Sequence, residues 1–174
     1  MIPEAVLKWR HFTGIAETSG FEPALMLAVI WQESGGESAA WNPEQRYRWF
    51  WNVRTDQPFR KVTEEESASE FPPKDFPCLA GDPDQEWWAQ QASWGLMQPM
   101  GAVARECGYR GLWLPALIRE PDLNIQIGCT HLARKLKQAG GDIRAALLRY
   151  NGGGNQKYDD EVMEKYELVK GRHV

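Results

Sequence analysis

The residue best placed to do chemistry is a carboxylate at the end of an apolar run. Residues 23–31 are apolar throughout, and Glu33 lies just beyond them. Pro23 at the start and Gly35 after the end predict a helix over 23–33, and a helix that is apolar on nearly all sides is buried. Burial and the negative end of the helix dipole both raise the pKa of a carboxyl group there. Glu33 is therefore a candidate general acid, unless it simply reaches water beside the glycine break.

Two further segments place polar side chains at predicted helix ends. Gly95-Leu96-Met97-Gln98 puts a flexible glycine before a helix predicted over 97–107, and Gln98 can both donate and accept hydrogen bonds. Tyr150-Asn151-Gly152-Gly153 ends another helix with a phenol and an amide. Each segment also has an ordinary interpretation: the first as a helix-capping segment, the second with Asn151 as a C-terminal cap. Tyr158, at the start of the last predicted helix, is compatible with half-buried packing.

Helices must position these side chains, because helical spacing of apolar residues accounts for most of the chain outside residues 41–92. Glycine pairs end several of these segments, and Asp142 can cap the helix that follows it. We predict helices or helical turns at 3–18, 23–33, 97–107, 113–118, 122–139, 143–150 and 156–170. No run of alternating polar and apolar residues predicts a sheet. The expected fold class is therefore all-α.

Residues 41–92 have a different composition, with five of the nine tryptophans and six of the eleven prolines. The prolines argue against long regular structure, so we predict an irregular insertion. Glu64-Glu65-Glu66 either starts a short helix or forms a solvated turn. The insertion is either a groove wall whose tryptophan rings stack on sugars or a self-packed surface loop, and its position between Glu33 and Gln98 favours the wall. Arg46, Tyr47 and Arg48 could meet peptide carboxylates there.

Length and composition limit the class of protein. The 174 residues, 43% hydrophobic and 25% charged, predict a single folded domain over 1–174. A net charge of −4 without a basic stripe argues against nucleic acid as a partner. No apolar stretch is long enough to span a membrane, and the first residues lack the basic start of a cleaved signal peptide. We therefore expect a monomer made in the cytoplasm without a cleaved signal.

The cysteines and histidines give no sign of a metal site. Cys78, Cys107 and Cys129 lack metal-type spacing, and three cysteines cannot all pair within one chain, which favours reduced thiols. The histidines are far apart, and His131 on a helical face is typical of packing or surface; the three are His11, His131 and His173. We predict no metal and no other cofactor.

Taken together, the polar segments resemble one enzyme family. Glu33-Ser34, Gly95-Leu96-Met97-Gln98, Tyr150-Asn151-Gly152-Gly153 and Tyr158 with Val162 occur in that order. This resembles the lytic transglycosylases of the soluble type, which have a lysozyme-like fold related to goose-type lysozyme. The resemblance runs from about residue 20 to 165 and includes 122–132 and 140–147. The chain departs from the family in the 62 positions between Glu33 and Gly95, an unusually long spacing, and in Pro99-Met100-Gly101 after the second motif.

The resemblance implies an all-α, lysozyme-like fold, peptidoglycan glycan strands as the partner, and Glu33 as the only catalytic acid/base. Glu33 would protonate the oxygen between N-acetylmuramic acid and N-acetylglucosamine and then take the proton of the muramoyl C6 hydroxyl, giving a 1,6-anhydro product without water. Ser34 would support the turn after the acid. The residues implied in substrate binding are Ser34, Gln98, Met100, Tyr150, Asn151 and Tyr158.

Two alternatives remain open. A goose-type lysozyme would hydrolyse the same bond with a second carboxylate, since hydrolysis by glycosidases usually uses two. The unplaced carboxylates that could approach Glu33 are Glu37, Glu44, Asp56, Asp82, Asp84 and Glu86. An inactive glycan-binding or virion structural module is the other alternative. By analogy, a wall-degrading enzyme without a signal peptide favours a phage or prophage source, acting as an endolysin or in a virion.

Overall fold

The computed structural model describes residues 1–44, 47–79 and 81–172. It is 53% helix and 7% strand, and the fold is mostly helical and lysozyme-like, as predicted. One part, here called the helical half, comprises residues 1–40 and 119–172. Its helices are α1 (Glu4–Leu7), η1 (Lys8–Phe12), α2 (Thr13–Thr18), α3 (Pro23–Ser34), α7 (Pro121–Gln138), α8 (Ile143–Tyr150) and α9 (Tyr158–Lys170).

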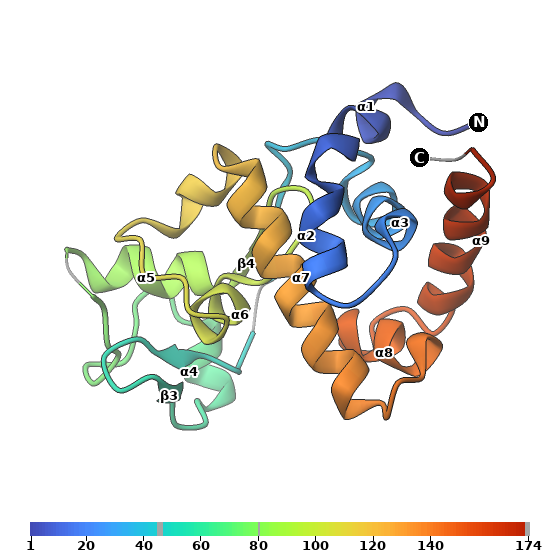
Figure 1. Ribbon diagram of the computed structural model, residues 1–174. Coiled ribbons are helices and arrows are strands. Elements are labelled where there is room, and N and C mark those ends of the chain that lie inside the picture. The colour runs from blue at the N-terminus through green and yellow to red at the C-terminus, as the bar shows by residue number, and fades with distance from the viewer. Residues whose placement is uncertain (45–46, 80, 173–174) are drawn as a thin grey trace.

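The remaining described residues between 41 and 118 form the insertion half. Its helices are α4 (Glu64–Ala68), α5 (Pro83–Gln90), α6 (Gly101–Glu106) and η2 (Leu114–Ile118), and its strands are β1 (Trp41–Pro43), β2 (Trp51–Asn52), β3 (Gln57–Pro58) and β4 (Ala92–Trp94). Figure 1 shows α4, α5 and α6 on one side of the molecule, α1–α3, α8 and α9 on the other, and α7 between them.

The helical half has one dry core built around α3, the helix predicted from its unbroken apolar run. Every residue from Ala24 to Ile30 is buried, and Gly35 ends the helix in the left-handed conformation that glycine adopts without strain. The helices packed against α3 include α2 and α9. The core also takes in Leu96 and Met97, which reach it from the insertion half.

Helix α7 serves both halves because its two faces are apolar. Ile125, Cys129 and Leu132 belong to the core around α3, whereas Ile127 packs into a second cluster with Trp94 of β4. The helix at the start of the chain, predicted as one segment, consists of α1, η1 and α2 in succession. Asp142 caps α8 as predicted, accepting hydrogen bonds from the backbone N–H groups of two residues in its first turn.

The described residues also contain four short strands that the sequence pattern did not predict. β1 pairs antiparallel with β4, and β2 pairs antiparallel with β3. These strands are two or three residues long, too short for the alternation that a sequence pattern can reveal, and pairing of distant segments defines them. The predicted start of the helix over 97–107 is wrong, since α6 begins at Gly101. Trp94 donates its backbone N–H to the carbonyl of Pro99 at 3.1 Å, so residues 95–98 form the turn of a hairpin.

The insertion contains an aromatic cluster of its own. Phe50 stacks on Trp87 with ring centroids 4.1 Å apart, and Phe76 meets both edge-on. Of the two alternatives for Glu64-Glu65-Glu66, the short helix is present as α4, with a capping box between Thr63 and Glu66. The irregular loop predicted from the prolines is thus a packed substructure, although its regular elements are short. The prediction about Arg46 lies outside the described residues.

Candidate active site

Glu33 lies at the C-terminal end of α3, and its side chain meets the first residue of α9. The hydroxyl of Tyr158 donates a hydrogen bond to Oε1 of Glu33. Tyr158 is 2% exposed and packs in the core around α3. The two residues are 125 positions apart, so the packing of α9 on α3 creates this pair.

Burial raises the pKa of Glu33 from its ordinary value of 4.5 to about 7. Loss of solvent disfavours the charged carboxylate, whereas the hydrogen bond from Tyr158 stabilises the carboxylate and lowers the pKa. Near neutral pH both protonation states of Glu33 are therefore populated, which suits a group that first gives and then takes a proton. Burial and the nearby charge of Glu33 raise the pKa of Tyr158 far above its usual range, so its phenol remains a donor.

Tyr150, the last residue of α8, lies beside the Glu33–Tyr158 pair. Its ring is stacked with that of Tyr158 at a centroid distance of 6.5 Å. Its hydroxyl donates to the carbonyl of Met97 at 2.6 Å and so joins α8 to the 95–98 turn. His131 of α7 packs against Tyr150 with ring centroids 5.1 Å apart, and burial lowers the pKa of His131 to about 3. His131 is thus a neutral packing residue.

The 95–98 turn is held by a buried amide on α7. Asn124 accepts from the backbone N–H of Met97 at 3.0 Å and donates to the carbonyl of Trp94 at 2.7 Å. Gly95 has φ +73°, and a Cβ there would lie 2.4 Å from Nδ2 of Asn124, so no other residue fits without displacing this amide. The sequence pattern places Asn124 only near the start of a predicted helix. Its signal was a polar side chain on the apolar face of that helix.

Gln98 adopts φ +48°, a left-handed conformation that costs a residue with a side chain about 1 kcal/mol or more. Its Oε1 accepts from the Ser93 hydroxyl at 2.7 Å, and its Nε2 donates to the carbonyls of Gly95 at 2.7 Å and Ala40 at 3.2 Å. The helix-cap interpretation is wrong, because Met100 occupies the N-cap of α6 and no side chain caps that helix. Gln98 instead fixes the turn beside the loop that follows α3.

Ser34 and Asn151 hold backbone segments next to Glu33 and Tyr150. The Ser34 hydroxyl lies 2.8 Å from the carbonyl of Leu96 and accepts from the N–H of Gly36 at 3.2 Å, which ties the end of α3 to the turn. Asn151 is the C-cap residue of α8. Its amide oxygen is best placed facing the N–H groups of Asn155 and Gly154, at 2.6 and 3.1 Å, and so orders the loop before α9.

Glu33, both tyrosines and the 95–98 turn are therefore connected through direct contacts. The family model of the transglycosylase SLT domain matches residues 11–168. The chain belongs to this family. Neither a curated protein nor a solved structure matches the chain. Family membership makes peptidoglycan the substrate and lytic transglycosylase the general class of activity.

Of the six other carboxylates considered as partners for Glu33 in this SLT domain, all but Asp84 have hydrogen-bond or ion-pair partners of their own. Glu86 is buried in an ion pair with Arg105 at 2.7 Å, and Asp56 pairs with Arg110. Asp82 caps α5, whose first turn contains Asp84. Glu37 and Glu44 are exposed and accept hydrogen bonds from residues within two positions of themselves. Within the described parts of the chain, no hydrogen bond or ion pair joins Glu33 to another carboxyl group.

A polar network beside the catalytic candidate was not anticipated from the sequence. Gln32 donates to Glu161 of α9 at 2.7 Å and accepts from Lys165 at 2.7 Å, while Asn155 donates to the same Glu161 oxygen at 3.0 Å. The network fixes the start of α9, which contains Tyr158, against the end of α3. No local pattern could have paired Gln32 with residues 129 and 133 positions away.

No cluster of three or more histidine, cysteine or acidic residues suited to a metal ion occurs in residues 1–44, 47–79 and 81–172. His173 lies outside them. Cys78, Cys107 and Cys129 are free thiols. Of the helices in the same ranges, none is long and apolar enough to cross a membrane.

Proposed function

We propose that the SLT domain cleaves the bond between N-acetylmuramic acid and N-acetylglucosamine without water, with Glu33 as its only acid/base. The observation that carries this proposal is the Glu33 carboxyl group at the end of α3, which accepts a hydrogen bond from Tyr158 and has a pKa of about 7, with no contribution from a second carboxylate to the shift. Hydrolysis by a glycosidase usually requires a partner carboxylate, which activates water or acts as the nucleophile. An intramolecular nucleophile removes that requirement and gains from proximity.

In the proposed reaction, protonated Glu33 gives its proton to the oxygen that links the two sugars. The bond from C1 of the muramoyl residue to that oxygen breaks, and N-acetylglucosamine leaves with a free hydroxyl. The Glu33 carboxylate then takes the proton of the muramoyl C6 hydroxyl while O6 bonds to C1. The ring closure gives a 1,6-anhydro end and returns Glu33 to its protonated state, so one group performs both proton transfers.

The surrounding residues have supporting roles in this proposal. Tyr158 stabilises the carboxylate form between the two proton transfers through its hydrogen bond. Tyr150 positions the 95–98 turn through the carbonyl of Met97. Gln98 and Met100 are proposed to line the glycan site, Ser34 and Asn151 to hold the segments on either side of it.

Product analysis tests the mechanism. Purified peptidoglycan digested with the protein in water enriched in ¹⁸O should give muramoyl ends that are anhydro by mass spectrometry and carry no ¹⁸O. Reducing muramoyl ends with one ¹⁸O would overturn the proposal and favour the goose-type hydrolase. Absence of any new ends, with glycan binding retained, would favour the inactive glycan-binding module.

A further inference from the structure

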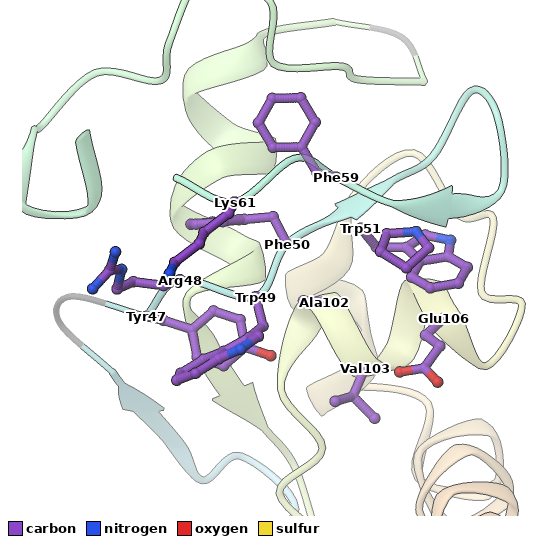
Figure 2. Close-up of a pocket in the computed structure, with 11 residues that line it drawn as sticks. Tyr47, Arg48, Trp49, Phe50, Trp51, Phe59, Lys61, Ala102, Val103 and Glu106 are labelled. Atoms are coloured by element: carbon purple, nitrogen blue, oxygen red, sulfur yellow. The ribbon is translucent and has the colours of Figure 1, made fainter. Parts of the chain in front are cut away.

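A large cavity lies in the insertion half, away from Glu33. It has a volume of about 640 Å³, within the ~300–1,000 Å³ that is typical of ligand sites. The insertion provides one wall and α6 the other (Figure 2). Aromatic and charged side chains line it, among them Tyr47, Arg48, Trp49, Lys61 and Glu106.

The cavity presents aromatic surface that the protein itself does not cover. Trp49 is 74% exposed, a larger fraction than for any other tryptophan of the chain. The ring of Tyr47 contacts the rings of Trp49 and buried Phe50 edge-on, each at a centroid distance of 5.8 Å. Trp49 therefore packs against Tyr47, although most of its own surface is exposed. A supported but exposed aromatic surface beside a cavity of this size is typical of a binding site.

Charges of opposite sign stand at opposite sides of the cavity. Figure 2 shows Arg48 and Lys61 together on one side and Glu106 on the other, with aromatic side chains between them. Arg48 donates from Nε and Nη2 to the carbonyl of Val62, which fixes its guanidinium and leaves its other N–H groups free of that carbonyl. In the described ranges no carboxylate forms a salt bridge with Arg48 or Lys61. Glu106 has one long contact, 3.4 Å from Arg134.

The ligand that fits has a carboxylate, an apolar middle and an amine. We propose that this cavity binds a peptide stem of peptidoglycan, an inference that rests on the proposed function of the domain. Arg48 and Lys61 receive a stem carboxylate, and Glu106 receives the side-chain ammonium of the diamino acid. The aromatic side chains between them cover the alanine methyl groups and the aliphatic part of that side chain.

The cavity is linked to the proposed catalytic site through α6. Tyr150, whose ring stacks with that of Tyr158, donates to the carbonyl of Met97 in the 95–98 turn, and α6 begins just after that turn at Gly101. Ala102, Val103 and Glu106 of α6 line the cavity. In this proposal a stem held there belongs to a strand that also reaches Glu33, and it helps to hold the substrate without taking part in the chemistry.

Binding of a free stem peptide tests this proposal directly. The probe is the tetrapeptide L-Ala-γ-D-Glu-L-Lys-D-Ala or its diaminopimelate counterpart, titrated by calorimetry into the Glu33→Gln protein so that no turnover intervenes. We expect millimolar or tighter binding that Lys61→Glu weakens at least fivefold. The matched control is Lys74→Glu, which makes the same charge change at an exposed site of the insertion outside the cavity and should leave binding unchanged.

A second variant assigns the other end of the ligand. Acetylation of the peptide's side-chain amine should weaken its binding to the protein with Glu106 intact. The same acetylation should not change binding to Glu106→Gln. Glu70→Gln, at an exposed position, is the control and should respond to acetylation as the protein with Glu106 does. No binding of either tetrapeptide, or equal effects of Lys61→Glu and Lys74→Glu, would overturn the proposal. The proposal would also be overturned if a peptide-free N-acetylglucosamine tetramer bound in the cavity instead. That binding would be lost in Trp49→Ala and unaffected by Lys61→Glu.

The two proposals fail separately. If the wild-type protein yields hydrolytic ends but the tetrapeptide binds as expected, the transglycosylase mechanism is wrong and the stem site stands. If anhydro ends form but no tetrapeptide binds, the transglycosylase mechanism stands and the stem site is wrong. With both in place, Lys61→Glu should raise KM severalfold on intact peptidoglycan, whereas Lys74→Glu should leave this KM unchanged.

Discussion

The helical half and the insertion half differ in the size of their apolar cores and in the length of their regular elements. The helical half encloses one continuous apolar core, and its candidate catalytic groups stand at helix ends, with Glu33 near the end of α3, Tyr150 at the end of α8 and Tyr158 at the start of α9. The insertion half has short elements joined by a small aromatic cluster and by a buried ion pair between α5 and α6. The proposed chemistry thus lies in the helical half, which has the more regular packing. The open cavity lies in the insertion half, which has the less regular packing.

The difference follows from what each half must hold fixed. A proton transfer needs its groups held to a fraction of an ångström, which long packed helices provide. A binding surface needs shape and charge but tolerates small shifts. The insertion is nevertheless anchored firmly at one point, where Arg105 meets Glu86 through two hydrogen bonds of 2.8 and 2.7 Å and is fully buried.

The largest expected effect is on the chemistry of the helical half. Glu33→Gln removes the proposed acid/base while retaining shape, and we expect turnover to fall by roughly 10⁴-fold, about 5 kcal/mol of barrier. Release of soluble fragments from peptidoglycan measures it. Glu37→Gln, at an exposed position four residues on, should keep normal activity. Equal clearing of a wall suspension by wild type and Glu33→Gln would disprove the assignment.

The next effect concerns the anchor of the insertion half. Arg105→Met leaves Glu86 buried without its partner, and we expect a loss of about 3–5 kcal/mol in the free energy of unfolding. Hydrogen exchange should rise first in α5 and the aromatic cluster and later in α3 and α9. Arg110→Met breaks the exposed pair with Asp56 and should cost less than about 1 kcal/mol. Uniform destabilisation of both halves by Arg105→Met would contradict the comparison.

A third effect is the dependence of stability on pH. The pKa of Glu33 is about 7 in the folded protein and 4.5 ordinarily, so the unfolded chain releases this proton first as the pH rises. The stability associated with protonated Glu33 is complete below pH 4.5 and is lost between there and pH 7, a loss of about 3 kcal/mol. Glu33→Gln should therefore be more stable than wild type at pH 8 by about that amount, and equally stable at pH 4. Denaturant titrations at both pH values check this, and a difference that does not depend on pH would refute it.

A smaller effect is expected when the hydrogen bond between Tyr158 and Glu33 is removed. Tyr158→Phe removes the hydrogen bond that lowers the pKa of Glu33, so that pKa should rise. The fall in kcat/KM at high pH, expected near pH 7 in wild type, should move upward by about one pH unit, roughly 1.4 kcal/mol. Tyr166→Phe on the same helix loses a hydroxyl contact with Glu22 and should leave the profile unchanged. A downward shift for Tyr158→Phe would mean that its hydroxyl opposes the carboxylate.

The smallest effect is at the edge of the insertion half. Thr63→Ala removes the capping box of α4 and should cost about 1 kcal/mol in the free energy of unfolding. Thr55→Ala, in an exposed turn of the same insertion, is the control. Activity on peptide-stripped glycan should be the same in both variants, because α4 is remote from α3 in the fold (Figure 1). A loss of that activity in Thr63→Ala would show that the halves are more tightly coupled than their packing indicates.

Sequence patterns predicted the features that neighbouring residues determine. The unbroken apolar run gave α3 and the position of Glu33 at its end, and Asp142 and the glutamates after Thr63 marked true helix starts. The order of the polar segments led to the family. Each of these depends on spacing within one helix or turn, where backbone geometry fixes which residues share a face or an end.

Sequence alone determined which residues stand at helix ends and which family motifs they form. Tertiary structure decided that Tyr158 meets Glu33, that Asn124 occupies the space left by Gly95, and that residues 95–98 turn before α6. It also brought the insertion's aromatic and charged side chains around one cavity. The physical reason is the range of the interactions: caps and helical periods act over a few residues, whereas desolvation, close approach and ion pairing depend on segments that meet only when the core forms.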